Sequence, residues 1–251
     1  MKRLGILSGN DLKIIALVTM LIDHMALLLM GSNVYMHIVG RLSFPIFAFM
    51  IAEGARYTKN KLRYALTLLL AGTVSQFVYS FVLKTSVLNI IFTFLFSVLI
   101  IYALDLFKMC LFNSECKVIF KILSGILFVS AVLTLYLMPR IIGSIFNFNF
   151  YYSYGFYGAM CAAFASAPSS NRLKNPPQWL IKLDTIPVRV LCMAIPLFYY
   201  SIRSGSIQMF SLLSLVLLLF YSGKKGDYKI KYLFYIFYPA HLLLLYLISL
   251  I

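Results

Sequence analysis

The sequence predicts an all-helical bundle that crosses a membrane many times, and its composition, hydropathy and charge placement all favour that class. Of the 251 residues, 62% are hydrophobic and only 12% are charged, and the mean hydropathy is +0.92. A soluble domain of this length needs far more polar surface than this composition supplies. Because apolar runs follow one another along the whole chain, we expect one integral membrane domain over residues 1–251.

Nine apolar runs have about the length needed to cross a hydrocarbon core of roughly 30 Å. They cover residues 12–30, 35–53, 63–83, 88–107, 118–138, 150–167, 187–202, 206–222 and 232–250. The sixth and seventh runs are short. Pro45, Pro196 and Pro239 lie inside runs, where the missing N–H of proline is expected to kink the helix.

The first two runs are joined by residues 31–33, a Gly-Ser-Asn turn too short to do more than reverse the chain. We therefore expect an antiparallel helical hairpin. At about 1.5 Å per residue, Asp23 and Arg41 lie at the same depth, roughly 10 Å inside the outer boundary, and His24 is one residue deeper. Ionisable groups at that depth are costly in lipid, so the hairpin is the first candidate for a functional site.

Two later loops interrupt the apolar runs. Residues 139–150, rich in Phe and Asn, are expected to form an outward loop that either caps a cavity or forms an interfacial aromatic belt. Residues 168–187, which carry Pro176, Pro177 and Trp179, are expected to form the one long cytosolic loop.

The basic residues indicate the orientation of the bundle. With the N-terminus in the cytosol, nine crossings place 18 of the 22 lysine and arginine residues in cytosolic segments. Lys84, Arg140 and Arg203 fall outside, and Arg41 lies within the second run. Because cytosolic loops of membrane proteins carry such an excess, we expect a cytosolic N-terminus, an outside C-terminus and a place in the bacterial cytoplasmic membrane.

This placement also accounts for the net charge of +15 without a nucleic-acid partner, since the basic residues lie in short loops between apolar runs. The four cysteines have no paired spacing and no histidine-rich neighbourhood. We therefore expect neither disulfides nor a metal site.

Several motifs carry a resemblance to a known family. They are LKIIALVTMLIDHMA from residue 12, GRLSFPIFAFMIAEGARYTKN from residue 40, Ser75-Gln76, YGFYG from residue 154 and YIFYPAHLLLLY from residue 235. With these motifs the chain resembles the TraX family of integral membrane acetyltransferases, whose founding members acetylate the N-terminus of conjugative pilin subunits. The resemblance implies acetyl-CoA as acyl donor. TraX proteins in turn resemble the acyltransferase-3 group, in which an Arg and a His near the first helices are thought essential. In this sequence Asp23, His24 and Arg41 fill comparable places. Their order and spacing differ from those of the acyltransferase-3 group.

Acyl transfer from a thioester needs a base for the attacking group and donors for the developing oxyanion. Histidine is the natural base, because its ordinary pKa lies near neutrality. His37 lies near the outer boundary and is interpreted as an interfacial residue. His24 and His241, roughly 18 Å and 13 Å from the cytosolic ends of their helices, share one depth if the first and last helices pack together. We expect His24 to be the general base, with His241 assisting or exchanging roles; the alternative is a pair of structural histidines.

Asp23 and His24 are adjacent on a helix and point about 100° apart, so they are not expected to pair with each other. Asp23 is expected to pair with Arg41 instead. In the functional interpretation Arg41 also binds the thioester carbonyl or a phosphate of the donor. In the alternative interpretation this ion pair only fixes the packing of the hairpin.

Six residues are candidates for holding acetyl-CoA: Glu53, Arg56, Lys59, Ser75, Gln76 and Tyr238. The first three lie at the cytosolic end of the second run, where an anionic donor enters, although topology alone also places basic residues there. The last three are neutral groups that either orient the donor or join helices by hydrogen bonds.

The sequence thus predicts a membrane-bound, acetyl-CoA-dependent acetyltransferase that acts on an amine, such as the N-terminus of a peptide or pilin, presented in or across the membrane. Two other classes stay open. One is a proton-coupled transporter in which Asp23, His24 and Arg41 relay protons. The other is a non-enzymatic assembly factor for a surface filament, in which the buried charges only specify helix packing.

Overall fold

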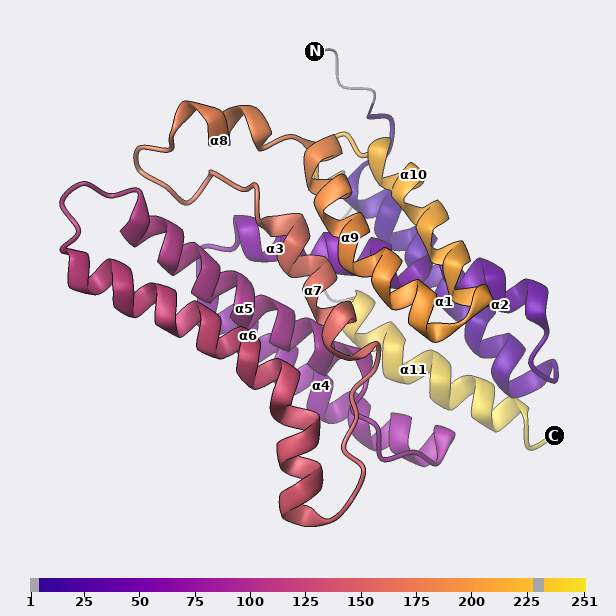
Figure 1. Cartoon of the computed structure of the whole chain (residues 1–251). Helices are drawn as coiled ribbons and strands as arrows, with labels where there is room; N and C mark the ends of the chain where they lie inside the picture. The colour runs from indigo at the N-terminus through magenta and orange to yellow at the C-terminus, as the bar shows by residue number, and fades with distance from the viewer. Residues whose placement is uncertain (1–4, 228–232) are drawn as a thin grey trace.

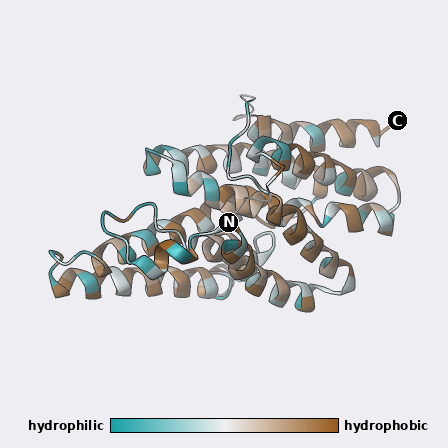
Figure 2. Cartoon of the chain, turned by 90° about the horizontal axis from the view of Figure 1, so that it is seen from above, coloured by the Kyte–Doolittle hydropathy of each residue, from teal (hydrophilic) through white to brown (hydrophobic). Residues whose placement is uncertain are grey.

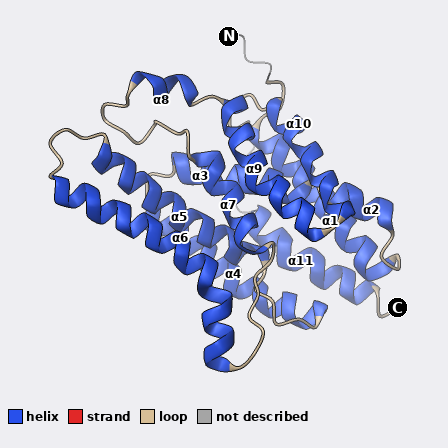
Figure 3. Ribbon diagram, viewed as in Figure 1, coloured by secondary structure: helices blue, strands red, loops and turns tan. Residues whose placement is uncertain are grey.

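The computed structural model describes residues 5–227 and 233–251, and within these residues the fold is all-helical. Figure 3 shows helices and loops with no strand, and helices make up 76% of the structure. The elements in order are α1 (Gly9–Leu29), α2 (Val34–Gly40), α3 (Ser43–Tyr57), α4 (Lys61–Leu83), α5 (Ile90–Leu111), α6 (Val118–Phe146), α7 (Gly155–Ser166), α8 (Gln178–Leu183), α9 (Ile186–Ser204), η1 (Ser206–Leu212), α10 (Leu213–Leu219) and α11 (Leu233–Ile248). The predicted all-helical class is confirmed for these residues.

Six helical segments are long and apolar enough to cross a membrane. They are Gly9–Leu29, Val34–Tyr57, Lys61–Leu83, Ile90–Leu111, Val118–Phe146 and Ile186–Ser204. The segments Ser206–Leu219 and Leu233–Ile248 are apolar but shorter, and α7 has 12 residues. Each of the nine predicted runs therefore coincides with helix, and six of them have spanning length; residue 232, the first of the last run, lies outside the described residues.

The bundle is organised around α3 and α7. In α3, 12 of 15 residues are buried, and in α7, 8 of 12, whereas α6 buries only 2 of its 29 residues. In Figure 1, α3 and α7 lie in the middle of the molecule, and α5 and α6 form a flank. Figure 2 shows apolar residues along most helices and polar residues mainly in the loops and helix ends, as expected when lipid covers the outside.

The second predicted run is divided into two helices at Arg41 and Leu42. Proline at position 45 has no N–H for the carbonyl of Arg41 and its ring crowds that carbonyl, so the helix breaks one turn before it. The hydroxyl of Ser43 donates to the carbonyl of Gly40 (2.8 Å) and satisfies one group at the break. The sequence predicts a kink at Pro45, and the structure has a break between two helices. Arg41 lies at this break.

The prediction that an outward loop begins at Pro139 is wrong, because α6 continues through this proline to Phe146. Figure 1 shows α6 turning sharply over its last part. Proline leaves the carbonyl of Leu135, four residues earlier, without its helical partner. The hydroxyl of Tyr152 donates to that carbonyl (3.2 Å), which is why the helix survives the proline.

Candidate functional site

A pair of histidines joins the two ends of the chain. The Nδ1 atom of His24, on α1, lies 2.8 Å from Nε2 of His241, on α11, and the ring centroids are 4.9 Å apart. Figure 1 shows α1 and α11 lying close together, although more than 200 residues separate them in sequence. The two histidines therefore meet, as their predicted depths allowed, and their shared catalytic role stays a prediction.

The hydrogen bonds around this pair determine which nitrogen carries each proton. Nδ1 of His241 lies 2.7 Å from the carbonyl oxygen of Phe237, which only accepts, so Nδ1 of His241 must donate. In neutral His241 the Nε2 atom is then an acceptor, and Nδ1 of His24 donates to it. This leaves Nε2 of the partly exposed His24 with a lone pair, the state required of a proton acceptor.

Beside the histidine pair, Asp23 joins the two helices of the hairpin. Its Oδ1 atom accepts from Nη2 of Arg41 (3.2 Å), as predicted, and also lies 2.8 Å from Nδ1 of His37. His37 is therefore not a lone residue, and its predicted place at the interface stays a prediction. His37 and Arg41 are four residues apart, so they lie on one face of the helix and reach the same carboxylate.

Gly40 permits this close approach of the two helices. A Cβ at position 40 would overlap the Cβ and carboxylate of Asp23. The backbone of α2 therefore passes directly against the Asp23 side chain, and only glycine fits there. The GR dipeptide at positions 40 and 41 thus supplies a close contact and a cation to the same acidic residue.

Gln208, in η1, belongs to the site although the sequence did not single it out. Its Oε1 accepts from Nη1 of Arg41 at 3.4 Å, a long hydrogen bond, and the residue is 4% exposed. The only signal for it in the sequence is an amide within an apolar run. That signal is common to many residues that merely join helices, so the assignment needs the tertiary contact.

Two of the six residues predicted to hold acetyl-CoA are paired within the protein at the other end of α3. The carboxylate of Glu53 is buried, forms an ion pair with Arg189 and accepts from the hydroxyl of Tyr221 (2.9 Å). Arg56 makes two hydrogen bonds to the carboxylate of Asp184 (2.6 and 2.9 Å). Both side chains therefore fasten α3 to later elements, and neither is presented to a donor at the surface.

Asp184 is a junction outside the spanning helices. Besides Arg56, its Oδ2 atom accepts from the backbone N–H and the hydroxyl of Ser170, both at 2.9 Å. Burial alone would raise the pKa of this carboxyl, but the hydrogen bonds from Ser170 and Arg56 outweigh burial and hold the pKa below its ordinary value of 3.8. The long predicted loop is thus tied to α3, and it contains the short helix α8.

The remaining candidates are divided between the site and its surroundings. Tyr238 is buried beside the histidine pair, with its ring 5.9 Å from His241 and 6.5 Å from His24. Lys59 is exposed at the end of α3, and Ser75 is fully buried in α4. Gln76 uses its amide to hold the α4–α5 connection, accepting from Asn89 (2.8 and 3.0 Å) and donating to Ser80 and Val87. Of these four residues, Tyr238 is the one whose ring packs near both histidines.

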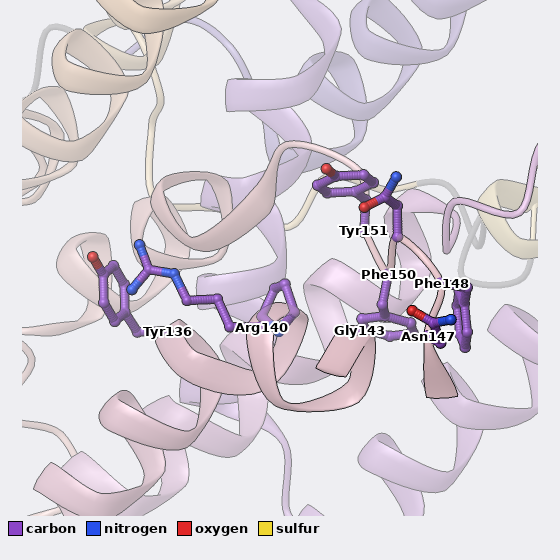
Figure 4. Close-up of a pocket in the computed structure, with 9 residues that line it drawn as sticks. Tyr136, Arg140, Gly143, Asn147, Phe148, Phe150 and Tyr151 are labelled. Carbon is purple, nitrogen blue, oxygen red and sulfur yellow. The ribbon is translucent and has the colours of Figure 1, made fainter. Parts of the chain in front are cut away.

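A surface pocket of about 740 Å³ lies elsewhere, between the end of α6 and the connection to α7. Figure 4 shows Arg140, Asn147, Phe148 and Tyr151 around it. None of its lining residues belongs to the histidine or aspartate cluster. Among residues 5–227 and 233–251, no group of three or more His, Cys, Asp or Glu side chains is arranged to hold a metal, and the four cysteines are free thiols.

The fold and the site together define a multi-pass helical membrane protein with a histidine pair and an Asp-Arg-His cluster held between its first helices and its last. The chain belongs to the TraX family, because the family model described as TraX protein matches residues 8–249. A protein named "Probable fimbrial assembly protein FimC, serogroup H1", from Dichelobacter nodosus, is 27% identical over 250 residues, which cover 95% of this chain and 94% of that protein. No solved structure matches the chain.

Proposed function

We propose that this protein is a membrane acetyltransferase that uses acetyl-CoA to modify the N-terminal amine of a filament subunit or similar peptide. The observation that carries the proposal is the hydrogen-bonded series from the Phe237 carbonyl through His241 to His24, which leaves a basic nitrogen on His24. The name of the relative from Dichelobacter nodosus, a probable fimbrial assembly protein, supports a place in filament assembly. TraX family membership supports the acyl-transfer chemistry through the family resemblance.

In the proposed reaction, Nε2 of His24 takes a proton from the acceptor amine while the amine nitrogen attacks the thioester carbonyl carbon. The C–N bond forms, and the electron pair of the C=O bond moves onto oxygen. When this tetrahedral intermediate collapses, the C–S bond breaks and the proton on His24 passes to the leaving thiolate. The products are the acetylated amine and coenzyme A. His241 and the Phe237 carbonyl keep His24 in the required tautomer and stabilise its protonated form.

Asp23 and His37 are positioning residues in this proposal. Asp23 holds the guanidinium of Arg41, and His37 holds Asp23 from the other side. Arg41 then carries the positive charge that stabilises negative charge on the substrate during transfer. Four of the residues predicted to hold the donor do not contact this cluster: Glu53, Arg56, Ser75 and Gln76. The donor is therefore proposed to enter along other residues. Of the basic residues predicted to bind it, Lys59 is exposed at the surface.

The proposed setting is the bacterial cytoplasmic membrane, with nine crossings, the N-terminus in the cytosol and the C-terminus outside. The distribution of basic residues supports this orientation. Reporter fusions test it: a reporter active only in the periplasm should be active when fused after Ile251 and inactive when fused in the loop before α4. The reverse pattern would overturn the orientation.

The direct test of function is calorimetric binding of acetyl-CoA to the detergent-purified protein, followed by transfer of a radiolabelled acetyl group to an N-terminal peptide of a pilin. We expect saturable binding and turnover by the wild type, and in His24→Ala unchanged binding with turnover reduced at least a hundredfold. Full turnover by a monodisperse His24→Ala protein would exclude His24 as the base.

The outcome of the same experiment distinguishes the other two classes. A folded wild type that does not bind acetyl-CoA but co-purifies with filament subunits would be a non-enzymatic assembly factor, which the relative's name also favours. Uptake of a radiolabelled solute into proteoliposomes without acetyl-CoA would instead identify a transporter.

A further inference from the structure

A groove runs along one flank of the bundle, between α5 and α6. It has a volume of about 600 Å³. Phe107 and Leu111 of α5 form one wall, and residues of α6 between Lys121 and Leu133 form the other. None of its lining residues belongs to the histidine pair or the aspartate cluster. The groove therefore lies apart from the proposed acetyl-transfer site.

The groove follows the line along which α5 and α6 meet. Glycine at position 125 lets the Phe107 ring lie against the backbone of α6, since a Cβ there would come within 3.2 Å of that ring. The same ring stacks on Phe128, with the ring centroids 6.3 Å apart. Because α6 buries only 2 of its 29 residues and lies at the edge of the molecule in Figure 1, this line of contact faces the outside of the bundle.

The lining of the groove is apolar except for two side chains, Lys121 and Ser130. The Ser130 hydroxyl is already used, because it donates to the carbonyl of Leu127 (2.9 Å). The ammonium of Lys121 forms no ion pair within the part of the chain that the structure describes. The groove thus offers apolar surface over most of its length and one cation without a counter-charge.

The length of the groove matches one leaflet of a membrane. From Lys121 to Leu133 the helix rises about 18 Å, a little more than half of a hydrocarbon core of roughly 30 Å. Lys121 lies in the first turn of α6, which begins at Val118. This is the end of α6 that the basic residues predict to be cytosolic, where the headgroups of the inner leaflet lie.

An amphiphile with an acidic headgroup matches both parts of the groove. A lysine in this position keeps its aliphatic stem against apolar surface while its ammonium reaches the headgroups, and basic side chains at that level attract anionic lipids. A zwitterionic lipid has the same chains but no net charge for Lys121 to balance. The charge of Lys121 therefore favours an anionic occupant.

We propose that the α5–α6 groove binds an anionic phospholipid of the inner leaflet. One acyl chain lies along α6 from Ile122 to Leu133, and the phosphate lies at Lys121. The site does not depend on the proposed acetyltransferase function, since it shares no residue with the histidine pair or the aspartate cluster.

Quenching of tryptophan fluorescence by brominated lipid measures the affinity of this groove in a bilayer. Trp179 is the one tryptophan of the chain, so Leu133→Trp in a Trp179→Phe background places the only tryptophan at the inner end of the groove. In vesicles of phosphatidylcholine with an increasing share of chain-brominated phosphatidylglycerol, we expect about fivefold tighter binding of phosphatidylglycerol, as for one lysine near the surface. Leu127→Trp, an exposed position of α6 outside the groove, should show no preference. Equal preference at the two positions would overturn the proposal.

The same measurement tests Lys121 directly. Lys121→Gln in the Leu133→Trp protein removes the charge and should make the two lipids bind equally. Lys224→Gln is the matched control, because Lys224 is exposed, is predicted to be cytosolic and lies outside the groove. It should keep the fivefold preference. If a folded Lys121→Gln protein also keeps that preference, the proposal is overturned.

Native mass spectrometry tests whether the groove itself holds the lipid. We expect the wild type to retain phosphatidylglycerol, Ile126→Trp to lose it because a larger ring fills the groove, and the exposed neighbour Leu127→Trp to retain it. Ile122→Trp fills the same groove one turn earlier and replaces Ile126→Trp should that variant not fold. Retention by a folded groove variant would overturn the proposal. So would a wild type that is a dimer without lipid, because a second copy of the chain would then cover the groove.

Discussion

His24 and His241 show how one backbone carbonyl can determine the chemistry of a residue two contacts away. The Phe237 oxygen accepts only, so it fixes the tautomer of His241, and His241 in turn fixes that of His24. A carboxylate often performs this task in enzymes that use histidine as a base. Here Asp23 is the nearest carboxylate in sequence, but it pairs with Arg41 and His37 instead.

Replacing His241 tests this relay. His241→Phe fills a similar volume but removes the Nε2 acceptor of His241 from Nδ1–H of His24, so His241 no longer holds the tautomer of His24. We expect kcat for acetyl transfer to fall about a hundredfold in steady-state assays, with acetyl-CoA binding retained. His241→Gln, whose side-chain oxygen accepts, should recover part of the activity; equal activity of the Phe and Gln variants would contradict the relay.

At the scale of elements, the α1–α2 hairpin and α6 show how proline and glycine shape this bundle. Gly40 brings α2 against Asp23, and Pro45 ends that helix where Arg41 is needed. In α6, by contrast, Pro139 does not end the helix, because Tyr152 replaces the lost hydrogen bond. Two prolines therefore give different outcomes, depending on whether another residue satisfies the freed carbonyl.

Gly40→Ala should separate the two helices of the hairpin. The new methyl group would overlap the Asp23 side chain, so we expect a loss of about 1 to 3 kcal/mol of stability and weaker contacts from Asp23 to Arg41. Thermal unfolding in detergent measures the loss. Gly72→Ala, in α4, is the matched control, since its Cβ meets the Phe92 ring at an ordinary 3.4 Å and should leave the midpoint nearly unchanged.

A double-mutant cycle tests whether Tyr152 compensates for the hydrogen bond that Pro139 removes from α6. Tyr152→Phe removes the donor to the Leu135 carbonyl and should cost about 1 kcal/mol of unfolding free energy. In a Pro139→Ala background, alanine supplies its own N–H to Leu135, so the same Tyr152→Phe change should cost less. Equal costs in the two backgrounds would show that Tyr152 does not compensate for the proline.

At the scale of the whole molecule, ion pairs fasten the end of α3 to segments far away in sequence. Glu53 pairs with Arg189 on α9, and Arg56 pairs with Asp184 before α9. A hydrogen bond does the same for α5, where Lys108 donates to the carbonyl of Ser169 (2.8 Å). These contacts join the end of the bundle that the basic residues predict to be cytosolic. Lysines and arginines that were counted in the predicted orientation therefore also hold the bundle together.

The Arg56–Asp184 pair should make stability depend on pH. Because the folded pKa of Asp184 lies below 3.8, its contribution is present above that value and is lost as pH falls through the folded pKa. In detergent at neutral pH, the wild type should unfold at a higher temperature than Asp184→Asn. The difference between the two midpoints should disappear below roughly pH 4. A difference that stays constant into the acid range would mean that the pair contributes no charge-dependent stability.

Much of this protein follows from the sequence by itself. Hydropathy along the chain determined where helices form, and the rise per residue in a helix predicted that Asp23 meets Arg41 and that His24 and His241 share a depth. These are local properties, because a helix makes its backbone hydrogen bonds with near neighbours in sequence. The motifs also identified the family before any contact was known.

The tertiary structure alone decided which polar groups meet. The contact of His37 with Asp23, the pairing of Glu53 with Arg189 and the place of Gln208 beside Arg41 depend on how helices rotate and pack. Sequence spacing does not encode those rotations, since Gln208 lies 167 residues from Arg41. In a medium without water, buried polar groups must find one another across the bundle, and the packing of the apolar surfaces determines which of them can do so.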